Sequence, residues 1–257
     1  MSHEVLVESA EHLCTITLNR PEKRNALTAG MIERFLSGLD AANKDPSVRA
    51  IIVRANGPAF CAGLDLRVME AERKAGVADL GPLEIVLHHL EASPHPTIAA
   101  VQGDAVAGGC ELALHCDLRV ASETARLSMP LARIGLAVPV PLTWKLVEII
   151  GAARTYEMLF TGEGIDARTA LALNMVNRVV PPDDLDTATR ALASQIARNA
   201  PLAVRAMKAA VRRLSEHHRA VERADLEALG QEVRSSDDLK EGLAAQRERR
   251  APSFQGR

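Results

Sequence analysis

The chain has 257 residues, 47% of them apolar, which is enough for one large α/β domain with its own hydrophobic core. The formal net charge is −2 and the charged residues, 25% of the total, are spread along the chain, so the sequence carries no electrostatic footprint for nucleic acid or an anionic membrane. Aromatic residues make up only 2%, which argues against the base-stacking surfaces of proteins that bind single-stranded nucleic acid.

The first residues of the chain and its cysteines indicate the cellular compartment of the protein. The first ten residues, MSHEVLVESA, contain acids where a signal peptide needs a basic segment and an apolar run, and no stretch of eighteen apolar residues occurs. We therefore expect a cytoplasmic protein. The cysteines form no C-x-x-C pair, which predicts buried, reduced thiols at Cys14, Cys61, Cys110 and Cys116.

Strand patterns dominate the first hundred residues. Residues 4–9 and 12–19 alternate apolar and polar, and residues 48–55 and 96–103 are short apolar runs typical of strands buried on both faces. Between them, Thr28 is a suitable N-cap for a helix whose apolar face carries Met31, Ile32, Phe35, Leu36 and Leu39. Beyond residue 141 the patterns are mostly helical, interrupted at residues 174–180.

A short internal repeat follows two of the strands. The segments NGPAFCAGLDL (56–66) and QGDAVAGGCEL (102–112) match at a constant offset of 46, with Gly57 over Gly103, Ala59 over Ala105, Gly63 over Gly109, Asp65 over Glu111 and Leu66 over Leu112. A glycine turn that opens a helix exposes backbone N–H groups, and two such turns can meet around one developing oxyanion. The alternative is that the glycines only allow close strand-to-helix packing.

Neither copy of the repeat fits a phosphate-binding loop. The chain lacks G-x-x-x-x-G-K-[ST], and GDAVAGG lacks the G-x-G-x-x-G order of a dinucleotide fold. No His, Asp or Glu cluster at ligand spacing accompanies Glu111, so we expect no metal.

The sequence resembles the crotonase (enoyl-CoA hydratase/isomerase) superfamily. The resemblance covers nearly the whole chain, through ITLNRPEKRNAL (16–27), GPAFCAGLDL (57–66), AVAGGCELALHCDLRVAS (105–122), MLFTGEGIDARTALALNMVNRVVP (158–181) and EGLAAQRERRAPSFQG (241–256). It implies an α/β fold of repeated ββα units in two roughly perpendicular sheets. We expect residues 1–197 to form this core and residues 198–257 to form a helical region that mediates homotrimers, often paired into hexamers.

The resemblance also implies a ligand and its contacts. The substrate is expected to be an acyl-CoA thioester, with coenzyme A entering as part of the substrate and no permanently bound cofactor. The oxyanion hole would be the backbone N–H groups of Leu64 and Gly108. Coenzyme A would be bound by a neighbouring subunit's basic C-terminal helix and, in this subunit, by Lys23, Arg24, Ala26, Ala59, Ala62 and Asp65.

Glu111 matches the first of the family's two catalytic glutamates, three residues after Gly108. A carboxylate beside the α and β carbons of a thioester can take or give the proton of a hydration or isomerisation step. The alternative is an acid that only stabilises the positive end of its own helix.

The second family glutamate is missing, because Leu131 occupies its place. Hydration wants two titratable groups, whereas an allylic isomerisation needs one carboxylate, so the sequence favours isomerisation or weak hydration. His115, one helical turn after Glu111, is a candidate replacement. The segment 135–146 departs from the family's glycine-rich pattern, so Leu131, Val138, Val140, Leu142 and Trp144 are expected to line a reshaped acyl pocket.

Two other functions remain open from the sequence. One is a non-catalytic acyl-CoA binder that kept the fold, and the other is an enzyme for a different enolate reaction such as decarboxylation or dehalogenation. Fold does not decide among them.

Overall fold

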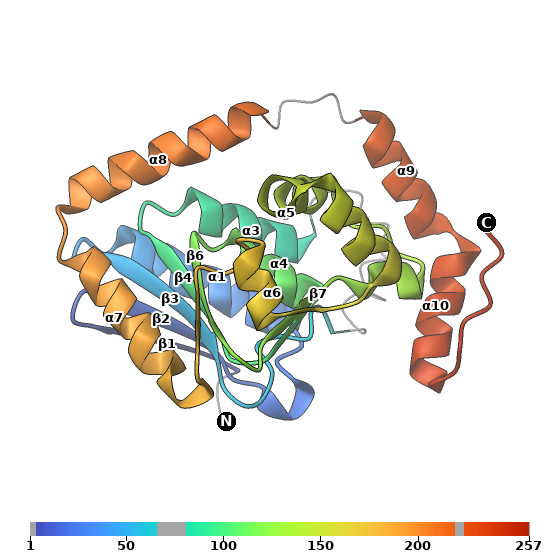
Figure 1. Cartoon of the computed structure of the whole chain (residues 1–257), viewed down its shortest axis with the longest axis horizontal. Helices are drawn as coiled ribbons and strands as arrows, with labels where there is room; N and C mark the ends of the chain where they lie inside the picture. Colours follow the sequence, from blue (N-terminus) through green and yellow to red (C-terminus); the bar gives the residue numbers. More distant parts are fainter. Residues whose placement is uncertain (1–3, 66–80, 219–223, 257) are drawn as a thin grey trace.

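The computed structural model describes residues 4–65, 81–218 and 224–256, and within these ranges the chain is a mixed α/β structure with strands first and helices last (Figure 1). The α/β prediction is therefore confirmed. The helix that the sequence repeat predicts after its first copy falls on residues 66–80, outside the described residues.

The main sheet has six strands in the order β1-β2-β3-β4-β6-β9. β1 pairs antiparallel with β2, and every later pair is parallel, so the carboxyl ends of β2, β3, β4 and β6 meet at one edge. The strands predicted from alternation and from buried runs all form. The bounds are β1 (Val5–Ala10), β2 (Leu13–Leu18), β3 (Ala50–Ala55), β4 (Thr97–Val101), β6 (Leu118–Ser122) and β9 (Arg178–Val180).

A second, smaller sheet lies beyond that edge. It contains β5 (Asp104–Val106), β7 (Arg126–Ser128) and β8 (Ile165–Asp166), with β5 parallel and β8 antiparallel to β7. The sequence patterns did not predict these strands, because two or three residues are too few to show a period. The isolated bridge from Cys61 to Ala105 attaches the loop after β3 to this sheet.

Helices cover both faces of the main sheet. One face packs against α1 (Ala29–Lys44), α3 (Pro82–Ala92) and α4 (Gly108–His115), and the other packs against α7 (Leu185–Ala197). The cap of α1 is as predicted, since Met31 N donates to Thr28 Oγ1 at 3.2 Å. The apolar face predicted for this helix points into the core.

The remaining helices form the second half of the chain, and α8 runs along the outside of the molecule (Figure 1). They are α5 (Val140–Thr161), kinked at Gly151, α6 (Ala167–Ala172), α8 (Pro201–His218), α9 (Ala224–Ser235) and α10 (Asp237–Glu248). α10 packs tightly on the short 3-10 helix η2 (Pro130–Ile134), where a Cβ added to Gly242 would lie 2.3 Å from Ile134 O. A domain boundary at residue 197 stays a prediction.

The structure bears on two further sequence predictions, the cellular location and the state of the cysteines. In the described part of the chain, none of the helices combines the length and the apolarity needed to cross a bilayer; the cytoplasmic location stays a prediction. All four cysteines are free and buried. Burial raises the pKa of the Cys61 and Cys116 thiols to about 12 each, and it also raises the pKa of Cys14 and Cys110.

A buried arginine fastens α4 to the strands around it. The guanidinium of Arg119, in β6, donates to Met175 O and to Cys116 O, each at 2.6 Å, and to Leu114 O at 3.4 Å. Two of these acceptors belong to the carbonyl end of α4, where a cation also complements the helix dipole. Desolvation lowers the pKa of Arg119, but a guanidinium stays protonated.

Replacing this arginine tests how far the structure depends on it. We expect Arg119→Met to lower the free energy of unfolding by about 2–4 kcal/mol, because buried carbonyls lose their donors. Urea denaturation followed by circular dichroism measures the change. The control Arg154→Met removes an exposed pair with Glu157 and should cost less than about 1 kcal/mol; equal losses would contradict the proposed role of Arg119.

Candidate active site

Two backbone bends meet beyond the carboxyl ends of β3 and β4. Gly63, with φ of +91°, precedes Leu64, and Ala107, with φ of +48°, precedes Gly108. A Cβ added to Gly108 would lie 3.6 Å from Leu64 N, and one added to Gly63 would lie 3.2 Å from Gly108 N. The structure therefore brings the two predicted oxyanion-hole residues together.

Neither the N–H group of Leu64 nor that of Gly108 takes part in the backbone hydrogen bonds of its own bridge or helix. The bridge between Leu27 and Leu64 uses Gly63 O, which accepts from Leu27 N at 2.8 Å, and Asp65 N, which donates to Leu27 O at 2.9 Å. Leu64 N consequently points to the opposite side of its chain. Gly108 is the first residue of α4, and a first-turn N–H has no acceptor inside its own helix. Two such donors, one of them at a helix N-terminus, can bind one negatively charged oxygen.

Close packing at this point requires glycine. A Cβ on Gly109 would lie 2.2 Å from Cys61 O, and a Cβ on Gly103 would lie 2.0 Å from Pro58 O. At these two positions glycine is needed for close packing, which was the alternative explanation of the repeat. The two turns align differently in structure than in sequence. The sequence repeat has an offset of 46 residues, whereas the two residues with a positive φ, Gly63 and Ala107, are 44 residues apart.

Glu111 lies in the first turn of α4 and is only 5% exposed. Its backbone N donates to Ala107 O at 2.9 Å, which ties the carboxyl-bearing turn to the bend before Gly108. Burial, and after it the charge of Glu84, raises the pKa of the Glu111 carboxyl from 4.5 to about 8. The carboxyl group is mostly protonated at neutral pH, with an ionised fraction that grows as pH rises.

Glu84 is a carboxylate that the sequence analysis missed. It lies in the first turn of α3, directly after Leu83, whose Cδ2 lies 2.6 Å from where a Cβ of Gly108 would be. α3 and α4 therefore bring their first turns, and both acids, to the same region. Glu84 carries no recognisable motif, and residues 66–80 separate it from the preceding bend, so only the three-dimensional structure identifies it.

His115, the candidate replacement for the missing acid, lies in α4 with Glu111. His115 Nδ1 contacts the backbone oxygen Glu111 O at 2.8 Å, a bond within α4 that leaves its role toward the carboxyl group a prediction. Leu131 lies in η2, half-buried against the main core. The position of the family's second acid is thus apolar.

The residues predicted to line the acyl pocket lie in η2, in the first turns of α5 and in the segment between them. Leu142 is buried in the main core and Val138 packs against it, whereas Val140 and Trp144 are half-buried. The indole Nε1 of Trp144 is buried and has no hydrogen-bond partner among the described residues. A pocket lined by these side chains stays a prediction.

The residues predicted to bind coenzyme A surround the bend at Gly63. Lys23 is exposed and Arg24 forms an ion pair with Asp104. Ala26, Ala59, Ala62 and Asp65 provide backbone groups to the local scaffold: Ala62 N donates to Arg24 O at 3.0 Å, and Ala26 O and Ala59 O accept side-chain hydrogen bonds.

Two residues that hold this scaffold were not predicted. Arg20 donates to Asp65 Oδ2 at 2.9 Å and to Ala26 O at 3.0 Å. Asn25, fully buried with a φ of +55°, accepts from Arg20 N and donates to Asn56 O and Ala59 O at 2.9 Å each. Among the described residues there is no group of three or more His, Cys, Asp or Glu side chains that could hold a metal ion.

Comparisons with known proteins identify the family of the chain. Residues 8–257 match the family model for enoyl-CoA hydratase/isomerase. The 2,3-dehydroadipyl-CoA hydratase of Escherichia coli strain K12 is 34% identical over 255 residues, covering 99% of each chain. An enoyl-CoA isomerase/hydratase of Mycosarcoma maydis is 34% identical over 253 residues, covering 94% of this chain and 92% of that protein.

A solved structure shares the fold over its whole length. Methylmalonyl-CoA decarboxylase in complex with 2-nitronate-propionyl-CoA superimposes with a TM-score of 0.92 and 28% identity, covering 100% of both chains. The match supports the predicted crotonase fold. Since the family model spans nearly the entire sequence, the chain belongs to the enoyl-CoA hydratase/isomerase family of the crotonase superfamily.

Proposed function

We propose that this protein is an enzyme of the isomerase or lyase class that forms an enolate from an acyl-CoA thioester, with Δ3 to Δ2 isomerisation as its main reaction and hydration as a weak one. The observation that supports this most is the meeting of Leu64 N and Gly108 N beside a buried Glu111. Two fixed donors stabilise the negative charge that develops on the thioester oxygen.

One carboxylate is sufficient for the proposed isomerisation. Ionised Glu111 takes a proton from C2 of a Δ3-enoyl thioester, and the electron pair moves onto the thioester oxygen as a dienolate. When the dienolate collapses, Glu111 returns the proton to C4, and the double bond now joins C2 and C3. The apolar Leu131 is compatible with this reaction because no second acid has to activate water.

Decarboxylation is a second candidate, favoured by the similarity to methylmalonyl-CoA decarboxylase. In that reaction carbon dioxide leaves the α carbon, the same oxyanion hole accepts the enolate, and protonated Glu111 delivers the proton. A non-catalytic acyl-CoA binder is the third. All three bind an acyl-CoA, and its coenzyme A portion would contact Lys23, Arg24 and the backbone near Ala59.

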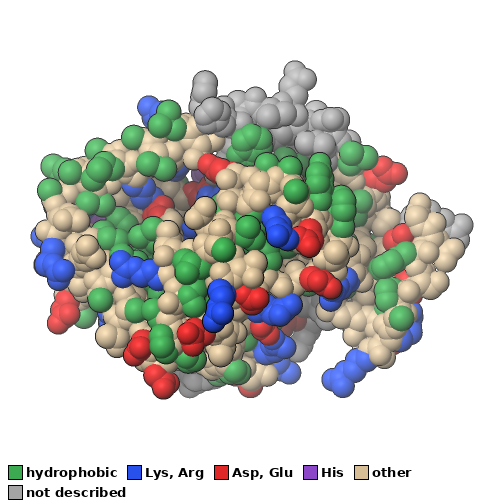
Figure 2. Space-filling model, in the orientation of Figure 1, with side chains coloured by type: hydrophobic (Ala, Val, Ile, Leu, Met, Phe, Trp, Pro, Cys, Tyr) green, Lys and Arg blue, Asp and Glu red, His purple; other side chains and the backbone are tan. Residues whose placement is uncertain are grey.

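The C-terminal helices support a proposed homotrimer or hexamer. Four large apolar side chains of α8 are more than half exposed: Leu202, Met207, Val211 and Leu214. Figure 2 shows apolar side chains gathered over the region of α8. In α5, the exposed rings of Tyr156 and Phe160 stack on each other. Such patches on a folded chain commonly pack against another subunit.

Substituting Glu111 tests the proposed catalysis. We expect Glu111→Gln to lower kcat at least about 100-fold, because the proton acceptor is lost, while the Kd for an acyl-CoA changes less than about threefold. Turnover is measured with Δ3-enoyl-CoA, and binding by calorimetry. Glu33→Gln, an exposed substitution in α1, is the control. Unchanged turnover in Glu111→Gln would refute the proposal.

Mass spectrometry of wild-type reactions in heavy water distinguishes the candidate reactions. Deuterium incorporation without addition of water supports isomerisation, and addition of heavy water supports hydration. Loss of carbon dioxide from an α-carboxylated substrate supports decarboxylation. Absence of any turnover, together with tight acyl-CoA binding, would support the binder instead.

The pH dependence of turnover tests the pair of acids. Because Glu111 must be ionised to accept the C2 proton, kcat/KM should rise with pH through a midpoint of about 8. Glu84→Gln removes a like charge, lowers the pKa of Glu111 and moves the midpoint to lower pH, by about half a unit or more. Glu33→Gln should leave the profile unchanged, and a profile insensitive to Glu84 would show that the two acids are uncoupled.

The proposed assembly is tested by a charge on α8. We expect Val211→Glu to shift the protein from trimers or hexamers toward monomers in analytical ultracentrifugation, because a carboxylate is costly in an apolar interface. The control Arg198→Glu changes the charge of an exposed position after α7. A wild-type protein that sediments as a monomer would contradict the assembly.

A further inference from the structure

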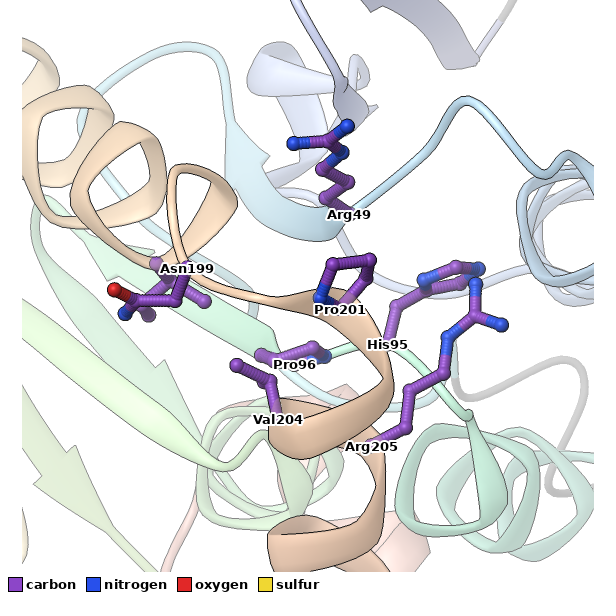
Figure 3. A pocket seen from close by; sticks show the side chains of 8 residues that line it. Arg49, His95, Pro96, Asn199, Pro201, Val204 and Arg205 are labelled. Atoms are coloured by element: carbon purple, nitrogen blue, oxygen red, sulfur yellow. The ribbon is translucent and has the colours of Figure 1, made fainter.

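A pocket lies at the edge of the sheet opposite the candidate active site. Arg49 directly precedes β3, His95 and Pro96 directly precede β4, and the remaining lining residues come from the end of α7 and the start of α8 (Figure 3). Leu64 and Gly108 follow the carboxyl ends of the same two strands. Strands of five to six residues separate the two regions by roughly 15–20 Å.

Two buried polar atoms of this pocket have no hydrogen-bond partner within the part of the chain that the structure describes. They are Nε2 of His95, a residue that is 1% exposed, and Nε of Arg205. Figure 3 shows the His95 imidazole and the Arg205 guanidinium beside each other, and the charge of Arg205 acts on His95. Buried polar groups in native proteins are nearly always hydrogen-bonded, so this pair points to a missing partner.

The surroundings of the pair are cationic. Arg49, which precedes β3, also lines the pocket, and its Nη1 donates to Ala197 O at 3.0 Å. Lys208 lies one turn after Arg205 and donates to His95 O at 2.9 Å and to Asp117 Oδ2 at 2.7 Å, so the nearby carboxylate is already neutralised. Two arginines remain without a carboxylate partner among the described residues.

The start of α8 adds further donors. α8 has 18 residues and begins at Pro201, which lines the pocket but has no N–H, and Val204 N already donates to Ala200 O at 3.1 Å. The donors that the first turn leaves are therefore the N–H groups of Leu202 and Ala203. Asn199 also lines the pocket, but Figure 3 shows its side-chain amide pointing away from His95 and Arg205. A helix N-terminus and two guanidinium groups are complementary to an anion with several oxygens.

We infer that this pocket binds a small oxyanion of the phosphate class, held by Arg49 and Arg205 and completed by His95. Hydrogen phosphate fits the unpartnered pair in either tautomer of His95, because its oxygens accept from Arg205 Nε and from an Nε2–H, and its hydroxyl donates to a bare Nε2. The site is separate from the coenzyme A contacts and does not rest on the proposed reaction.

Calorimetric titration with inorganic phosphate, at constant ionic strength balanced with chloride, tests the inference. We expect saturable binding to the wild-type protein and at least a tenfold lower association constant for Arg205→Met. The Arg205 guanidinium makes no hydrogen bond within the described part of the chain, so we expect this variant to fold, and circular dichroism verifies it. Arg49→Met should weaken binding in the same way.

Two controls separate this pocket from the coenzyme A region. Lys23→Gln should keep the phosphate affinity within about twofold, and saturating coenzyme A should not displace phosphate. No saturable binding to the wild-type protein, equal affinity in Arg205→Met, or displacement by coenzyme A would each overturn the inference. None of these results depends on catalytic turnover.

Discussion

The site depends on a backbone-to-backbone contact between two loops that follow neighbouring parallel strands. Gly103 and Gly109 leave no room for a side chain, because a Cβ on either would lie about 2 Å from a carbonyl oxygen of the segment 58–61. This contact fixes the separation of Leu64 N and Gly108 N, since each amide lies only a few residues from it. The donors are therefore preorganised by the fold before any ligand arrives, which is the condition under which such donors stabilise a developing anion most effectively.

The same contact determines the environment of Glu111. Packing of α4 between the sheet and α3 removes the carboxyl group from water, and Glu84 adds a like charge from the first turn of α3. An acid with a pKa near neutrality is a better proton shuttle at neutral pH than an exposed glutamate. The chain thus has a second carboxylate near the first, on an element different from the one that carries Leu131.

The sequence predicted most of the long elements and two turns that the structure brings together, and it failed mainly where the signal is short or distant. The five-residue strand β6 (Leu118–Ser122) was not predicted either. The alternation in residues 4–19, the apolar runs at 48–55 and 96–103 and the cap at Thr28 all correspond to observed elements, because each signal is local. The strands β5, β7 and β8 are too short to show a pattern, and they form because their partners are in place. Arg20, Asn25 and Glu84 were missed because their partners lie far away in the sequence. The repeat revealed two related turns, but aligning identical glycines placed Gly63 over Gly109. In the structure, the residue that matches Gly63 with a positive φ is Ala107.

The buried cysteines have a practical consequence for chemical labelling. Only the thiolate attacks a maleimide or an iodoacetamide, and the native fold both covers the four sulfur atoms and raises their pKa values. A single cysteine engineered at an exposed position of α1, such as Glu33→Cys, would therefore react with a fluorescent dye far faster than the natural thiols. The wild-type background can serve directly for site-specific spectroscopy, without first removing any native residue.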